Sequence, residues 1–280
     1  MCGKFGIKSE SVLNNYLNRE YGLPLFMDGY GNIYSYNIEK RLQQSIYLPN
    51  FPLIEPASVT NPSFALNLVN NNTKLWFTKH ESYTNLTTFY EWDITLSPFT
   101  ATYVKAYNTI VGLFGGACAV PGNDTQILLG GEPYGTGTIF KVDMSGNTPV
   151  FNYFFTLSNG RSNYGDLVYT TKNKILAIVS ETSYDPYGKY LHQYDDQGNF
   201  EFEINLPDPN IFIYYSMVEY ADGVYITGCS GPNDTESKLY KIETTWPYNR
   251  TVVGGIASQG CIFSASQSPV YCNNIFYPPI

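Results

Sequence analysis

Ile139-Phe140-Lys141-Val142-Asp143 is a short segment whose pattern of residue types returns at regular intervals along the chain. The pattern is an apolar residue, an aromatic residue, a polar residue, a second apolar residue and then Asp, Glu or Asn. It occurs at 33–37, 89–93, 139–143, 191–195 and 239–243. The first positions of successive copies lie 56, 50, 52 and 48 residues apart. This nearly constant period indicates a repeat architecture, in which each copy belongs to one supersecondary unit.

Three other series of short segments rich in Val, Ile, Tyr and Phe accompany the repeat, and turn-forming residues separate them. One series precedes each copy, at 25–27, 75–80, 127–131, 175–180 and 224–229. A second series is rich in Gly, Ala and Ser, at 63–69, 112–120, 164–170, 214–220 and 261–267. A third closes units with alternating residues, as at 100–107, 150–157 and 201–207. Such runs predict β-strands, four to each unit.

Four strands per unit, repeated five times, predict an all-β fold: a five-bladed β-propeller of four-stranded blades. Small side chains suit the crowded axis, so the second series is predicted to be innermost. The chain starts in the second strand of a blade. The ring is therefore predicted to close by combining the N-terminal strands (about 24–49) with the innermost strand at about 261–267, which removes open edges.

The repeat over about 21–271 resembles that of five-bladed β-propeller repeat proteins. The resemblance implies a single domain at 21–271, with an N-terminal arm at 1–20 and a C-terminal tail at 272–280. The only segment with helical character is 8–20. Two copies of the repeat continue into matching turns, 143–147 and 195–199, where Gly and Asn are expected to supply positive φ.

The charge balance excludes two classes of partner. The 280 residues contain 16 Lys+Arg and 24 Asp+Glu, a net charge of -8, and the cations are not clustered. Nucleic acids and anionic membranes are bound through clustered cations, so neither is an expected partner. No apolar run is long enough to span a membrane, and the N-terminus has no secretory signal.

The cysteines are scattered, without the Cys-x-x-Cys spacing of metal sites: Cys2, Cys118, Cys229, Cys261 and Cys272. They are expected to be reduced and mostly buried, with a Cys261–Cys272 bridge as the alternative. Only two histidines, His80 and His192, are available. No metal and no cofactor is therefore expected.

The hairpin after the second strand carries an acid closely followed by Tyr in four units. The predicted binding residues are Asp28 and Tyr30, Glu81 and Tyr83, Glu132 and Tyr134, and Glu181 and Tyr184. The fifth unit has Ser230-Gly-Pro-Asn233 instead. These hairpins all open on one face of a propeller.

Three interpretations of this acid–Tyr set remain open. In the first, Tyr packs between blades and the acid satisfies its hydroxyl. In the second, the acid accepts hydrogen bonds from sugar hydroxyls while the ring covers an apolar sugar face. In the third, several acids share a cation.

An enzyme is not expected. Five-bladed glycosidases of the arabinanase and levansucrase type place three carboxylates at the inner ends of innermost strands, where acids can work in pairs. The corresponding segments of this chain offer only Asp166 and Glu219. No nucleophile elbow or phosphate-binding loop is present. No catalytic residue is therefore assigned, and a five-bladed glycoside hydrolase acting through Asp166 is the second alternative.

The implied surface is rich in Asn, Ser, Thr, Tyr and Gly and poor in Lys, which suits binding by hydrogen bonds and aromatic contact. With no secretion signal, this composition resembles that of phage and virion structural proteins. The leading hypothesis is a non-enzymatic propeller on a virion surface, capsid or tail. Residues 1–20 would anchor it to other virion proteins, and the exposed face would contact host glycans. The first alternative is a free lectin resembling the tachylectin type, extracellular or cytoplasmic.

Overall fold

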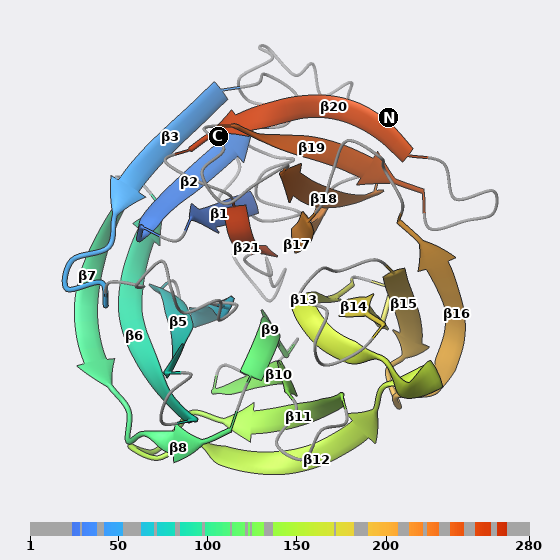
Figure 1. The fold of residues 1–280 in the computed structure, drawn as a ribbon. Helices are drawn as coiled ribbons and strands as arrows, with labels where there is room; N and C mark the ends of the chain where they lie inside the picture. The colour runs from blue at the N-terminus through green and yellow to red at the C-terminus, as the bar shows by residue number, and fades with distance from the viewer. Residues whose placement is uncertain are drawn as a thin grey trace, which may run out of the picture.

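Five antiparallel sheets surround a central axis in the computed structural model of the chain (Figure 1). The structure describes residues 24–28, 30–37, 42–52, 63–69, 72–81, 85–96, 99–112, 114–120, 123, 125–131, 137–170, 172–181, 190–206, 213–220, 223–229, 236–243, 250–258 and 262–267. The predicted arm, tail and helical segment lie outside these residues. In the described part, no helix has the length and apolar character needed to cross a membrane.

Each sheet is one blade, whose strands follow one another from the axis outward. Blade 1 holds β21 (Ile262–Gln267), β1 (Pro24–Asp28), β2 (Asn32–Asn37) and β3 (Leu42–Tyr47). Blade 2 holds β4 (Ser63–Val69), β5 (Asn72–Glu81), β6 (Leu86–Leu96) and β7 (Phe99–Ala106). Blade 3 holds β9 (Phe114–Ala119), β10 (Gln126–Gly131), β11 (Thr138–Asp143) and β12 (Val150–Thr156).

Blades 4 and 5 repeat the same order. Blade 4 holds β13 (Ser162–Tyr169), β14 (Lys174–Ser180), β15 (Tyr190–Asp195) and β16 (Phe200–Asn205). Blade 5 holds β17 (Ile213–Tyr220), β18 (Gly223–Cys229), β19 (Glu236–Ile242) and β20 (Arg250–Ala257). The 3-10 turn η1 (Ser158–Gly160) leads from blade 3 into blade 4. Blade 2 departs from the prediction of four strands, because the short β8 (Ile110–Val111) also pairs with β6.

The predicted strand series occupy the predicted places. The repeated segment forms the third strand of every blade, and the series rich in small residues forms the innermost strand. Blade 1 is completed from both ends of the chain, because β21 pairs with β1 and places Ala265 opposite Phe26. The prediction of a five-bladed propeller closed in this way is confirmed.

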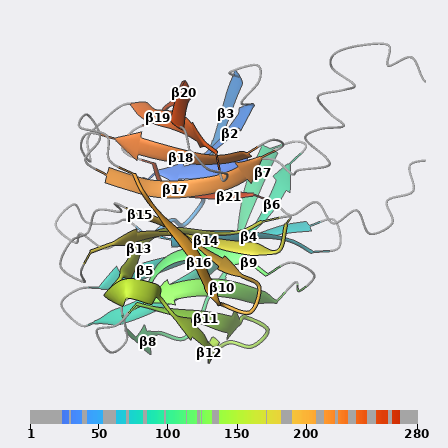
Figure 2. The same ribbon diagram turned by 90° about the vertical axis from the view of Figure 1, so that its right-hand side faces the viewer.

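The innermost strands contact their neighbours all round the axis, in the order β21, β4, β9, β13, β17 and back to β21. Figure 2 shows the inner strand β17 running nearly along this axis, while the outer strand β16 is tilted against it. This is the right-handed twist of a four-stranded sheet. Because every blade repeats the same strand directions, all hairpins between second and third strands lie at one end of the axis.

Apolar clusters lie at the junctions between neighbouring blades, and the described residues supply one cluster for each of the five junctions. Aromatic rings dominate several of them. Between blades 1 and 2, the rings of Phe51 and Phe77 lie 4.9 Å apart beside the buried Trp92. Between blades 3 and 4, the rings of Phe155 and Tyr194 lie 4.6 Å apart. Much of the aromatic content therefore packs blade against blade.

The two matching turns differ from the prediction in their backbone. Gly198 has φ of +87°, as expected. Gly146, Asn147 and Asn199 do not have positive φ, so that part of the prediction is wrong. The reason is visible in the second turn, where the Asp195 carboxylate accepts hydrogen bonds from both the backbone N–H and the side-chain amide of Asn199, each at 2.8 Å. Asn199 therefore acts through its side chain rather than through a left-handed backbone.

Candidate functional site

The hairpin ends of the blades form the candidate binding face, and the structure describes three of the predicted residues there. These are Asp28 and Tyr30 of blade 1 and Glu181 of blade 4. Glu81 ends β5, but its side chain lies outside the described residues. The remaining predicted residues also lie outside them: Tyr83, Glu132, Tyr134 and Tyr184. Their role stays a prediction.

Asp28 has no exposed surface and holds its own hairpin together. Its Oδ1 accepts the backbone N–H groups of Tyr30 at 2.9 Å and of Asn32 at 3.1 Å. Its Oδ2 accepts the hydroxyl of Tyr34 at 2.6 Å and the amide of Asn32 at 2.9 Å. Asp28 is thus a turn-stabilising residue, whereas Tyr30 is 46% exposed.

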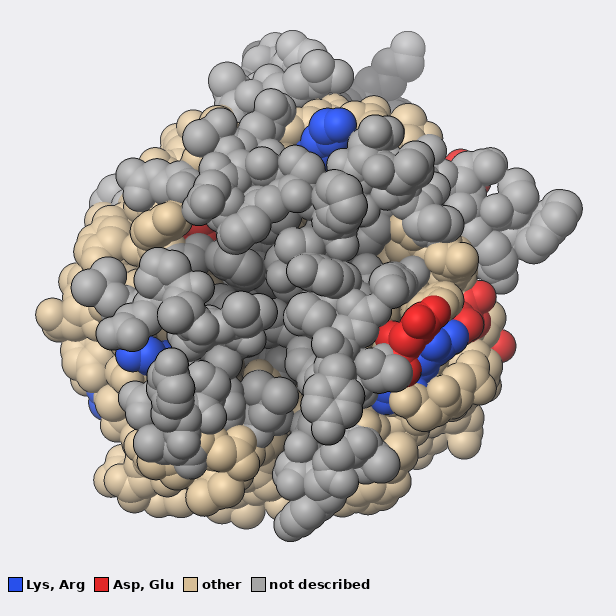
Figure 3. All heavy atoms as spheres, viewed as in Figure 1, with Lys and Arg blue, Asp and Glu red and all other residues tan. Residues whose placement is uncertain are grey.

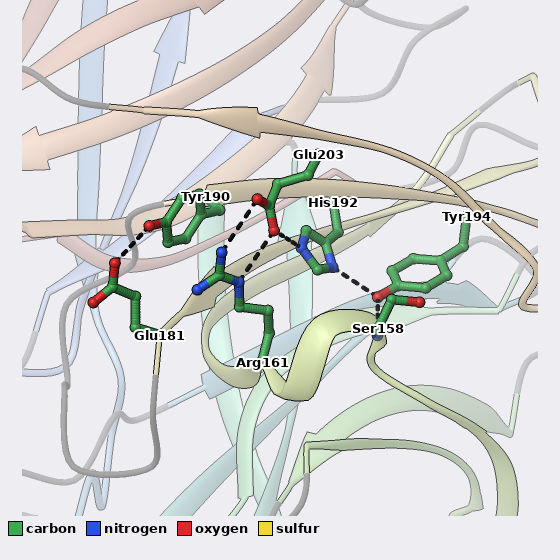
Figure 4. A network of polar contacts seen from close by, with 7 residues as sticks. All are labelled: Ser158, Arg161, Glu181, Tyr190, His192, Tyr194 and Glu203. Carbon is green, nitrogen blue, oxygen red and sulfur yellow. Dashed lines mark hydrogen bonds and ion pairs between the residues drawn. The ribbon is translucent and has the colours of Figure 1, made fainter.

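Glu181 is exposed and follows β14 directly. One of its oxygens, Oε1, accepts the hydroxyl of Tyr190, the first residue of β15, at 2.6 Å (Figure 4). In blades 1 and 4 the acid therefore accepts the hydroxyl of a tyrosine of the third strand, Tyr34 or Tyr190. This pairing was not predicted from the sequence. Its signal was present, because Tyr190 stands immediately before a copy of the repeat.

Arg161 lies beside these residues, just after η1. Its Nε and Nη2 donate to the two carboxylate oxygens of Glu203 on β16, at 3.1 and 3.2 Å. The guanidinium carbon lies 3.8 Å from the centre of the Tyr190 ring. Arg161 is thus fixed by a bidentate ion pair and by a cation–π contact. Burial alone would raise the pKa of Glu203, but hydrogen bonds from Arg161 and His192 outweigh burial and lower it.

His192 on β15 is fully buried and joins this cluster to the blade junction. Its Nε2 lies 2.7 Å from Oε2 of Glu203, and its Nδ1 lies 2.8 Å from the hydroxyl of Tyr194. The backbone N–H of Ser158 donates to the same hydroxyl at 3.0 Å. Burial lowers the pKa of His192, against the attraction of Glu203, so the imidazole is neutral at pH 7.

Charges of both signs gather over blade 4. Figure 3 shows basic and acidic atoms side by side at the right of the view, over the place of β15 and β16 in Figure 1. At the opposite end of the blade from Glu181, Lys174 pairs with Glu201. Its partner Glu201 is two residues from Glu203 on β16, so the two ion pairs are neighbours along the same strand.

The innermost carboxylate of the hydrolase alternative is not open to solvent. Asp166 on β13 is 1% exposed, and its Oδ2 accepts the backbone N–H of Met217 on β17 at 3.2 Å. It therefore joins blades 4 and 5.

Cys118 on β9 is a buried free thiol, as predicted. Burial and the charge of Asp166 raise the pKa of this thiol. The other four cysteine side chains lie outside the described residues. Within the part of the chain that the structure describes, no three His, Cys, Asp or Glu side chains come together as they would to hold a metal ion.

No protein-family model and no curated protein matches this chain. Solved structures match it at low similarity. A fungal lectin from Aleuria aurantia, described as six-bladed and fucose-recognising, is 10% identical with a TM-score of 0.45, over 84% of this chain and 77% of the lectin. An exo-β-1,3-galactanase from Phanerochaete chrysosporium is 10% identical with a TM-score of 0.45, over 74% of this chain and 56% of the galactanase. A Bacteroides caccae protein of unknown function is 13% identical with a TM-score of 0.40, over 84% of this chain and 72% of that one.

Proposed function

We propose that this protein is a non-enzymatic propeller that binds carbohydrate on the face formed by the hairpins between second and third strands. The observation that carries the proposal is the arrangement of Glu181, Tyr190 and Arg161 at the hairpin end of blade 4. The three side chains bind one another in a row, so an acceptor, an aromatic ring and a donor are held in fixed positions (Figure 4).

This combination matches the chemistry of a sugar. A sugar hydroxyl both donates and accepts hydrogen bonds, and the C–H groups of the ring form an apolar face. Oε1 of Glu181 holds the Tyr190 hydroxyl, which leaves Oε2 of this exposed side chain to accept from a ligand. The guanidinium of Arg161 supplies donors next to it. Since the three side chains are already ordered, binding costs less conformational entropy than it would with free side chains.

The charge of the cluster favours a neutral sugar over an acidic one. Arg161 and Glu203 neutralise each other as a bidentate pair. Glu181 then adds one carboxylate, in a chain whose net charge is already -8. A uronic or sialic acid would bring a further negative charge to this end of the blade, which like-charge repulsion disfavours.

A binding role suits the carboxylates better than catalysis. A glycosidase needs an acid whose pKa is raised so that it can protonate the leaving group. Glu203 has the opposite property, because its hydrogen bonds to Arg161 and His192 lower its pKa against the effect of burial. Asp166, the other candidate, is buried and accepts a backbone N–H from the neighbouring blade.

The biological setting that we propose is the surface of a virus particle, with host glycans as the ligands. It is supported by the composition, which is 14% charged and rich in Tyr and Gly. Proteomic analysis of purified particles tests this part separately. Absence of the protein from the particles would overturn the virion setting and leave the sugar-binding proposal standing as that of a free lectin.

A glycan array with neutral and acidic glycans tests the sugar-binding proposal. We expect the wild type to bind neutral glycans, and Glu181→Gln combined with Tyr190→Ala to weaken binding by about 10- to 100-fold, the equivalent of losing one or two hydrogen bonds to a charged group. Glu201→Gln is the matched control, because Glu201 is a carboxylate of the same blade that pairs with Lys174 and not with the three residues of the proposed site. Wild-type protein that binds no glycan would refute the proposal.

A further inference from the structure

We propose that His192 is a pH-sensitive positioning residue, whose protonation releases the turn Ser158–Arg161 and so loosens the blade-4 site. The role in ligand binding rests on the proposed function, whereas the release of the turn does not. Ser158 binds Tyr194, while Arg161 binds both carboxylate oxygens of Glu203 and lies over the ring of Tyr190. Two of these contacts, the hydrogen bond from Ser158 and the one from Arg161 Nε, end on an atom that also contacts His192 (Figure 4).

The hydrogen bonds around neutral His192 run in one direction. A carboxylate only accepts, so Nε2 of His192 carries the proton and donates to Glu203 at 2.7 Å. Nδ1 of the neutral ring is then an acceptor, and the hydroxyl of Tyr194 donates to it at 2.8 Å. The oxygen of Tyr194 is left to accept the backbone N–H of Ser158. Each donor along this row of hydrogen bonds therefore has a matched acceptor.

Protonation of His192 reverses this order at Tyr194. The imidazolium carries a second N–H, on Nδ1, which faces the Tyr194 oxygen. That oxygen would then accept from both His192 and Ser158, and its own proton would turn from Nδ1 toward the side chain of Ser158, which also hydrogen-bonds this hydroxyl. Because the charged imidazolium is a stronger donor than a neutral backbone N–H, we expect protonation to weaken the hydrogen bond from Ser158 to the same oxygen.

Protonation also changes the partner of Glu203. Its Oε2 accepts from both His192 and Arg161, and the contact with His192 is the shorter, at 2.7 against 3.1 Å. A positive charge on His192 strengthens its hold on this oxygen and repels the guanidinium of Arg161. The hydrogen bond from Arg161 Nε to this oxygen is therefore weakened at the same time as the one from Ser158.

The charged and titratable groups that face His192 are Glu203 from β16, Arg161 from the turn and Tyr194 from its own strand. Burial raises the pKa of Tyr194 to about 12, so this group stays protonated at neutral and acidic pH. Burial lowers the pKa of His192, and the positive charge of Arg161 lowers it further. The hydrogen bond and the charge of Glu203 raise this pKa, but by less. The free imidazole titrates near about 6.5, so the release is expected at more acidic pH than that.

The stability of the fold depends on pH through the same residue. The unfolded chain takes up the histidine proton at about pH 6.5, before the folded protein does. The stabilisation by neutral His192 is therefore complete above that pH and declines as the pH falls toward the lower pKa of the folded state.

Proton NMR of the full chain tests directly whether protonation of His192 releases the turn. The chain has two histidines, so His80→Gln assigns the two imidazole signals. From about pH 7.5 to about pH 4.5, we expect His192 to titrate below 6.5. The amide of Ser158 should exchange about tenfold faster once His192 is protonated, after correction for intrinsic exchange. The amide of Leu157, which donates to the carbonyl of Gly137 at 2.9 Å, is the internal reference.

Two variants distinguish the effect of His192 protonation on the turn from a general loss of structure. In Tyr194→Phe the link between His192 and Ser158 is absent, so exchange at Ser158 should be fast at pH 7.5 and independent of the titration. In His192→Gln the pH-dependent step should disappear. A His192 signal that titrates at or above about 6.5, or Ser158 exchange that ignores the titration in wild-type protein, would overturn the proposal.

The ligand arm uses the neutral glycans of the array at the same pH values. Binding should fall about tenfold as His192 is protonated, and should stay constant in His192→Gln. If no glycan binds at any pH, the proposed function is refuted. The exchange data still test whether protonation of His192 releases the turn. If glycans bind equally above and below the titration, the regulation fails and the proposed function stands.

Discussion

At the scale of single residues, two carboxylates of the hairpin face each accept a hydrogen bond from a tyrosine hydroxyl. Asp28 binds Tyr34 at 2.6 Å, and Glu181 binds Tyr190 at 2.6 Å. Tyr34 lies within the repeated segment of its blade, and Tyr190 immediately precedes it. These two tyrosines are thus more than apolar contacts, because each hydroxyl satisfies an acid.

Blade 2 also has a buried carboxylate that accepts a tyrosine hydroxyl. Glu91 on β6 is 2% exposed, and it accepts from Lys74, Trp76 and Tyr107. Tyr107 also contacts the carbonyl oxygen of Met144 in blade 3, at 3.1 Å. Burial alone would raise the pKa of Glu91, but the hydrogen bonds from Lys74 and Tyr107 lower it. This acid therefore stays charged and ties two blades together.

We expect Tyr107→Phe to destabilise the protein by about 1–3 kcal/mol, the cost of removing one partner from a buried hydrogen-bonded group. Urea denaturation followed by tryptophan fluorescence measures the change. Tyr153→Phe is the control, because Tyr153 is 67% exposed and its hydroxyl contacts the hydroxyl of Thr156 at the surface. Its effect should stay within about 0.5 kcal/mol. Equal effects of the two variants would contradict the structural role of Tyr107.

At the scale of elements, the two matching turns between third and fourth strands have similar sequences but different surroundings. Asp143 accepts the backbone N–H of Ser145 at 2.8 Å, much as Asp195 accepts those of Gln197 and Asn199. Both turns contact the preceding blade: the backbone N–H of Asn108 donates to the carbonyl of Asn147 at 2.9 Å, and Phe155 lies against the glycine of the second turn. Only in the second turn is the space beside the glycine filled by a side chain. A Cβ added at its glycine would lie 2.5 Å from Cδ1 of Phe155 on β12, whereas a Cβ at the other glycine would meet nothing closer than 3.7 Å.

Gly198→Ala and Gly146→Ala are therefore a matched pair. We expect Gly198→Ala to destabilise by about 1–3 kcal/mol, because it combines φ of +87° with a clash against Phe155. Gly146→Ala should change stability by less than about 0.5 kcal/mol, as substitutions at unstrained surface sites do. Thermal melting followed by circular dichroism compares them. If Gly146→Ala lowered the melting temperature as much, the difference between the turns would be refuted.

At the scale of the whole molecule, closure of the ring of blades depends on β21. This strand comes from the far end of the chain, pairs with β1 and contacts the innermost strands β4 and β17 on either side. Without it, blade 1 would expose the edge of β1 next to the axis. An unpaired edge is a template for pairing with another chain.

Ending the chain at residue 260 removes β21, and we expect it to abolish the cooperative thermal transition and cause aggregation. A chain ending at residue 267 keeps β21 and is the control, which should melt cooperatively. Size-exclusion chromatography and circular dichroism distinguish the two outcomes. A monomeric chain without β21 that melts at the wild-type temperature would show that closure is dispensable.

The candidate site could be predicted only in part. The acids Asp28 and Glu181 were found because they recur at matching places in the repeat. Their tyrosine partners were missed, since the hairpin tyrosines stand nearer in the sequence. Arg161 and Glu203 had no signal at all, because they are 42 residues apart and belong to no repeated motif.

The sequence by itself determined the number of blades, the order of strands and the closure of the ring. Those properties depend on period, on small residues at the axis and on where the chain begins within a blade, all of which can be followed along one dimension. Only the tertiary structure decided which carboxylate meets which donor. A hydrogen bond requires two atoms within about 3 Å of each other, and strand register and the path of each loop set that distance. The repeat therefore predicts the propeller, while the cluster at blade 4 exists only once β14, β15 and β16 are paired and η1 is laid against them.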